Sequence, residues 1–201
     1  MSHMSESAVK QLEGVAFEVL ETFGARGYRI DSALELDSSF DNPRNRSGLR
    51  RSLVIDAVKV GCSRVGLDFV ITSGGAAEIR IDTGSAIQVL RIQRAERHHS
   101  GELRVLANTS SSWADAFEED FLIREERWVF VYVPSDIGIA ELAIAPVIGI
   151  TSGLPGHLIL GTEIVLSGDN TVQRGFRTDD DTELPGFEED DEQGDLDAEG
   201  L

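Results

Sequence analysis

The stretch RWVFVYVPSD, residues 127–136, decides which kind of fold this chain can form. Its aromatic residues alternate with valines, in the order Trp128, Val129, Phe130, Val131, Tyr132 and Val133. Successive side chains of a strand point to opposite faces of a sheet, so both faces of this strand are apolar. We therefore expect a central strand, covered by helices on one face and by further sheet or a partner on the other.

Period-two alternation predicts further strands before and after this segment. The expected strands are residues 28–36, 52–60, 65–72, 77–82, 87–95, 102–108, 127–134 and 157–166. The Gly-Gly of VGLDFVITSGGAAEIRID (65–82) and the polar RHHSG (97–101) each predict a hairpin turn. Pro146, Pro155 and several glycines interrupt the apolar stretch 137–166, which favours short strands over one long helix.

Two segments show helical spacing instead. Residues 8–23, AVKQLEGVAFEVLETF, place apolar side chains on one face and are followed by the stop signals Gly24 and Gly27. In WADAFEEDF, residues 113–121, apolar residues recur every four positions, and Ser111 or Ser112 is a suitable N-cap. The expected fold is α+β: about eight mainly antiparallel strands, an N-terminal amphipathic helix and a short middle helix.

Charge divides the chain into a domain and a tail. The formal net charge is −18, and residues 179–201 hold 12 acidic and no basic residues, which leaves 24 acidic and 18 basic residues in 1–178. This high charge, together with the small number of apolar residues, predicts a disordered acidic tail. We assign residues 1–4 to an expression-vector scar, residues 5–178 to one domain and residues 179–201 to the tail.

Composition also limits the cellular setting. Cys62 is the single cysteine, so no disulfide can form within the chain. No apolar run approaches the roughly 20 residues of a membrane span, and the N-terminus lacks the pattern of a signal peptide. We expect a cytoplasmic protein that is not bound to a membrane, and the acidic balance disfavours free nucleic acid as a ligand. The sequence leaves the oligomeric state open.

One candidate catalytic group lies in the first predicted hairpin. Asp68 precedes Glu78 and Arg80, and two carboxylates beside a cation on adjacent strands can hold Mg²⁺ or Mn²⁺ for phosphodiester cleavage. The arrangement resembles the PD-(D/E)xK nucleases, in an active or a degenerate form. Arg80 is too basic to act as a general base and would stabilise charge instead. The alternative is a charge pair on one sheet face, because Glu78 and Arg80 are two residues apart.

A second resemblance involves the serine-rich stretch before the predicted middle helix. NTSSSWADAF, residues 108–117, resembles the central motif of ADP-ribosyltransferases of the Arg, Ser-Thr-Ser, Glu class. The resemblance implies an NAD site with Arg29 on the phosphates, Ser110 supporting the site and Glu163 stabilising the ribose. Helix capping is the alternative explanation of these serines.

The one concentrated basic stretch is NPRNRSGLRR, residues 42–51, and its glycine and proline indicate a loop. Its arginines, Arg44, Arg46, Arg50 and Arg51, are candidate interaction residues, and they could equally receive the acidic tail. Because no strong catalytic motif is present, we expect a non-catalytic interaction module without a cofactor. Its tail would steer it to a protein partner with a basic surface.

Overall fold

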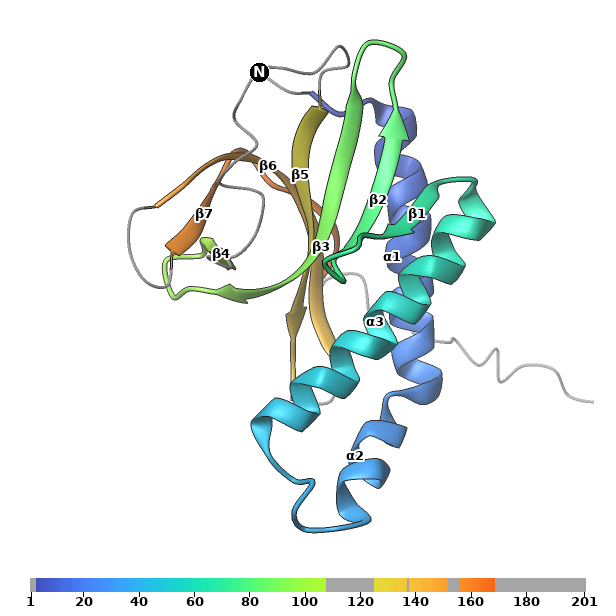
Figure 1. The fold of residues 1–201 in the computed structure, drawn as a ribbon, viewed down its shortest axis with the longest axis vertical. Helices are drawn as coiled ribbons and strands as arrows, with labels where there is room; N and C mark the ends of the chain where they lie inside the picture. Colours follow the sequence, from blue (N-terminus) through green and yellow to red (C-terminus); the bar gives the residue numbers. More distant parts are fainter. Residues whose placement is uncertain (1–2, 108–124, 137, 152–155, 169–201) are drawn as a thin grey trace, which may run out of the picture.

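The computed structural model describes residues 3–107, 125–136, 138–151 and 156–168. Within these residues the chain forms three helices followed by strands (Figure 1). The helices are α1 (Glu6–Arg26), α2 (Tyr28–Glu35) and α3 (Pro43–Val65). The strands are β1 (Asp68–Ile71), β2 (Ala77–Asp82), β3 (Ile87–Arg97), β4 (Leu103–Ala107), β5 (Glu125–Pro134), β6 (Ile139–Ile150), β7 (Gly156–Leu160) and β8 (Ile164–Gly168). The predicted α+β class is confirmed. The predicted middle helix and the acidic tail lie outside the described residues.

The eight strands form one sheet in which five strands close into a ring. β3 pairs with β4, β4 with β7, β7 with β6 and β6 with β5, and the parallel pairing of β5 with β3 completes the circuit. The other pairings among the described strands are antiparallel, with β1 and β2 extending from β3 and β8 pairing with β6. Figure 1 shows β4 and β7 curving away from the side of the sheet where the helices lie.

β5 has a core on each face, as its sequence predicts. Trp128, Phe130 and Tyr132 lie in the core that the helices cover, together with Leu12 of α1 and Val58 of α3. Val129 and Val131 face a second core inside the ring, which is formed by residues of β3, β4, β6 and β7. All five of these β5 side chains are buried, so the strand is covered by helices on one side and by sheet on the other.

The helix predicted over 8–23 is confirmed and is slightly longer than expected. Ser5 caps α1 by accepting a hydrogen bond from the amide of Ala8. α1 and α3 cross closely at Gly61, where an added Cβ would lie 3.0 Å from the Cα of Val15. Cys62 is buried at this crossing, and burial raises the pKa of its thiol to about 12.

Three predictions in the first third of the chain were wrong. Residues 28–36 and 52–60 are not strands but belong to α2 and α3, and residues 43–51 are not a loop but the first turns of α3. Asn42 caps α3 through the amide of Asn45, and Pro43 fits the first helical turn, where no amide partner is needed. Gly66, at φ 73°, ends the helix in the left-handed conformation, so β1 begins only at Asp68.

Both predicted hairpins are confirmed. β1 and β2 join through a turn in which Gly75 has φ 75°, and β3 and β4 join through a turn in which Gly101 has φ 86°. The predicted strand 157–166 is two strands, β7 and β8, because the chain turns at Gly161. β6 runs through Pro146 as one strand of 12 residues, which is longer than the short strands expected there.

Candidate functional site

The predicted nuclease residues share one face of the β1–β2 hairpin. Asp68 lies opposite Arg80, and Glu78 lies opposite Val70. Alternation puts Glu78 and Arg80 on the face opposite Ile79, whose side chain is buried beneath the helices. Asp68 is exposed, whereas Glu78 is 4% exposed.

Arginines already occupy the carboxylate of Glu78. Nη2 of Arg91, on β3, donates to Oε1 at 2.9 Å, and Nη2 of Arg80 lies 3.5 Å from Oε2. A divalent cation bound by Glu78 would have to displace these guanidinium groups, and Asp68 is the one other carboxylate of the proposed site. In the described parts of the chain, no three His, Cys, Asp or Glu side chains are grouped as metal ligands. The residues therefore fit a charge pair within the sheet better than a Mg²⁺ or Mn²⁺ site.

The residues of the second resemblance lie on separate elements. Arg29 is on α2, exposed beside the ring of Tyr28, and Ser110 lies outside the described residues. Glu163 lies in the turn before β8 and accepts hydrogen bonds from Nη1 of Arg97 at 2.8 and 3.1 Å. Arg97 also pairs with Glu141 on β6. Within the described residues, Glu163 is thus part of an ion-pair cluster that joins β3, β6 and the β7–β8 turn, and Arg29 does not contact it.

A shallow groove of about 730 Å³ runs beside Glu163. Its lining includes Arg104 and Glu102 near β4, His157 and Ile159 of β7, and Thr162. The rings of His98 and His99, at the β3–β4 turn, are in contact at a tilt of 42°, with centroids 3.6 Å apart, and Nδ1 of His98 lies 3.0 Å from Oγ of Ser100. The groove has charged groups at its edge but no buried nucleophile among these residues.

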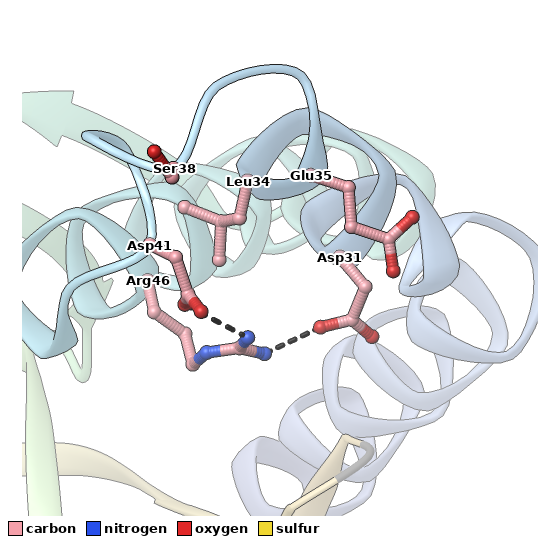
Figure 2. A pocket seen from close by; sticks show the side chains of 6 residues that line it. All are labelled: Asp31, Leu34, Glu35, Ser38, Asp41 and Arg46. Carbon is pink, nitrogen blue, oxygen red and sulfur yellow. Dashed lines mark hydrogen bonds and ion pairs between the residues drawn. The ribbon is translucent and has the colours of Figure 1, made fainter.

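The basic stretch is the strongest candidate for an interaction site, because α3 fixes its arginines on a helix. Figure 2 shows Arg46 between Asp31 of α2 and Asp41 of the α2–α3 loop. One guanidinium nitrogen pairs with Asp31, and the other lies 3.7 Å from Asp41. The pocket around this arginine measures about 450 Å³. Arg46 thus joins α2 to the start of α3, and its hydrogen bond to Asp31 raises its pKa.

Farther along α3, two of its arginines lie near an arginine of the sheet. We use the name arginine cluster for Arg50 and Arg51 of α3 and Arg94 of β3. Burial lowers the pKa of Arg50, and the nearby charges of Arg46 and Arg94 lower it further. All three arginines of the cluster also act on Tyr132, whose pKa is raised by burial and lowered by their charges. The cluster is therefore a local concentration of positive charge on a mildly acidic domain.

Sequence reasoning identified Arg50 and Arg51 but missed Arg94. Leu90 and Ile92 of β3 face the helices, and alternation puts Arg94 on that same face. Its parallel register with Tyr132 brings it below α3. The period-two pattern carries this signal, but the sequence analysis predicts a strand over residues 52–60 and therefore no helix above Arg94.

No helix among the described residues is long and apolar enough to cross a membrane. Comparison of the chain with protein-family models, with curated proteins and with solved structures finds no match in any of the three.

Proposed function

We propose that this protein is a non-catalytic, cytoplasmic interaction module whose acidic segment 179–201 steers it to a protein partner with a basic surface. The observation that carries the proposal is the separation of charge along the chain. Twelve of the 36 acidic residues fall in this segment of 23 residues, without one basic residue. A dense charge of one sign raises encounter rates with an oppositely charged surface, typically by about 10-fold to 1,000-fold at low salt.

The pairing of the catalytic candidates supports this proposal. Glu78 is bound by Arg91 and Arg80, and Glu163 is bound by Arg97. Each carboxylate connects neighbouring strands or turns of the sheet, which is a structural role. Each would have to give up an ion pair before it could take a proton from a substrate or bind a metal ion.

The test is an association-rate measurement with a charge-neutralised chain. A partner is first captured with the intact chain, and its binding rate is then measured over a salt series. In the matched variant, every Asp of 179–201 becomes Asn and every Glu becomes Gln, which keeps the length of the segment. We expect the association rate at low salt to fall at least about 10-fold and its salt dependence to flatten. Equal rates for the two chains at all salt concentrations would refute the proposed steering.

A metal-dependent nuclease is the second candidate, and the shared face of Asp68, Glu78 and Arg80 is the observation that favours it. Its test is thermal unfolding with and without Mn²⁺, using the variant with the neutral segment 179–201 so that the acidic segment does not bind cations. Stabilisation by Mn²⁺ that Asp68→Asn abolishes would support the nuclease. An unchanged melting temperature with Mn²⁺ would exclude this metal site.

A further inference from the structure

In the first turns of α3, the side of the helix that faces the core farther along carries arginines in place of apolar residues. Val54 and Val58 are fully buried against the sheet. Arg50 lies four residues before Val54, and Arg51 lies seven before Val58, so both arginines share this side of the helix. Where the apolar stripe of α3 ends, two arginines take its place on the same side of the helix.

Carboxylates of the described domain compensate the arginine cluster only in part, because Asp31 and Asp136 line a small pocket with Arg50 but Asp31 is already paired with Arg46. Arg50 is half-buried, and its one hydrogen bond to a described residue goes to the backbone carbonyl of Asp136, at 3.4 Å. Nε of Arg50 is buried and has no hydrogen-bond partner among the residues that the structure describes. Arg51 is exposed and has no ion pair with any residue in the described ranges. Arg94 pairs with Glu96 at 3.1 Å, but both side chains are largely exposed, so water screens that pair.

The described chain ends near this cluster. The described chain ends at Gly168 of β8, which lies opposite Glu141 near the start of β6. The β5–β6 turn just before that start contains Asp136, the residue that Arg50 contacts. Ten residues, 169–178, separate Gly168 from Asp179, and a chain of that length can span up to about 36 Å. The first carboxylates can therefore reach the arginine cluster without any movement of the domain.

We propose that residues 179–201 bind in cis to the arginine cluster of Arg50, Arg51 and Arg94. The occupant is acidic, it belongs to the same chain, and its attachment point lies at the same end of the domain. Each exposed pair contributes little, but several pairs formed by one tethered segment add together. This contact requires no partner protein, so its existence does not depend on the proposed function. Where a basic partner is present, the partner and the arginine cluster compete for one acidic segment.

Nuclear magnetic resonance of the intact chain with a spin label tests the contact. Gly194→Cys places one accessible thiol in the acidic segment for a nitroxide label. Cys62 can remain, because its burial and its raised pKa keep it from reacting. The signals to follow are the backbone amides of residues 46–51 and the side-chain Nε–H groups of Arg50, Arg51 and Arg94. We expect the label to broaden them at about 10 mM salt and to lose this effect near 1 M, where the screening length falls to about 3 Å.

Two variants and one control locate the contact. Arg50→Gln combined with Arg51→Gln should lower the equilibrium constant for the docked state by about fivefold, the expected loss for two exposed ion pairs. Arg104→Gln removes a charge from β4 that is exposed like that of Arg51 but lies outside the arginine cluster, and it should leave the broadening unchanged. If the double variant does not fold, the Asp and Glu residues of 179–201 can be neutralised instead, which leaves the domain intact. The same loss of broadening is expected.

Three results would overturn the proposal. The first is the absence of broadening at low salt, and the second is broadening that is spread evenly over the domain and persists in the double variant. The third comes from mixing isotope-labelled chains without nitroxide with unlabelled chains that carry it. If broadening of residues 46–51 in that mixture is comparable to that in chains carrying both labels, the acidic segment binds a second copy and not its own chain.

Discussion

Replacement of Glu78 should destabilise the sheet, although the sequence suggests a catalytic carboxylate at this position. The Glu78 side chain is 6% exposed and that of Arg91 is 12% exposed, so Glu78→Gln removes the charge from a buried ion pair. Removal of one partner of a buried pair typically costs about 3 to 5 kcal/mol, because the other charge stays buried. Glutamine still offers one oxygen as an acceptor, so we expect a loss of about 3 kcal/mol in the free energy of unfolding.

Arg80→Gln is the matched control on the other side of the same carboxylate. The Arg80 side chain is 41% exposed and its contact with Glu78 is 3.5 Å long, so its removal should cost at most about 1 kcal/mol. Urea unfolding, followed by the fluorescence of the buried Trp128, measures both changes. A Glu78→Gln chain within about 0.5 kcal/mol of the parent would refute the assignment of Glu78 to a structural ion pair.

This prediction changes how a nuclease assay must be read. Activity lost in a Glu78 variant would not distinguish a missing metal ligand from a destabilised sheet. Asp68 is exposed and forms no ion pair with a described residue, so Asp68→Asn should leave stability within about 0.5 kcal/mol. The Asp68 variant is therefore the one that separates metal binding from folding.

The close packing elsewhere leads to three further expectations. Gly61→Ala should lower the free energy of unfolding in urea by about 1 to 3 kcal/mol, because its Cβ would meet the Cα of Val15 at 3.0 Å. Gly48→Ala on the same helix is the control: its Cβ meets nothing within 4 Å, and the change should stabilise the chain by about 0.5 to 1 kcal/mol. Arg97→Gln should cost about 2 kcal/mol, measured in the same way, because it leaves Glu141 and Glu163 facing each other without their shared cation. The thiol of Cys62 ionises near pH 9 when the chain is unfolded and only near pH 12 when it is folded, so its contribution to stability is complete below pH 9. That contribution should fall by up to about 1.4 kcal/mol per pH unit between those values, and the fall should be absent in Cys62→Ala.

The two apolar faces of β5 made the layers of the fold predictable. A strand that is apolar on both faces needs two covers, and the structure supplies three helices on one side and the closed ring on the other. The ring itself could not be foreseen, because it depends on the parallel pairing of β3 with β5. No local sequence pattern specifies a pairing between strands that are separated by another strand and a long connection.

The errors in α2 and α3 each have a local cause in the sequence. Apolar and polar residues nearly alternate in YRIDSALEL, residues 28–36, which is the pattern of a strand. The β-branched side chains of VIDAVKV, residues 54–60, also favour strands. The same letters place Val54, Ala57, Val58 and Gly61 on one helical face, which is the face that is buried. The capping pair of Asn42 and Pro43 was the local signal that favours the helix. The Glu78–Arg80 pair was among the alternatives, but the pairs of Glu78 with Arg91 and of Glu163 with Arg97 were missed, because these arginines come close only through strand register and the β7–β8 turn.

The two proposals predict opposite effects on partner binding, which makes them separable in one binding assay. A docked acidic segment is unavailable to a partner, so the apparent affinity of that partner is reduced by the fraction of chains in which the segment is free. Removal of the charges of Arg50 and Arg51 should therefore strengthen binding of a basic partner. The gain is at most about fivefold, because docking itself is expected to weaken by that factor. Neutralisation of residues 179–201 should weaken it. If both changes weaken binding, the arginines contact the partner directly, and the acidic segment does not compete with it for them.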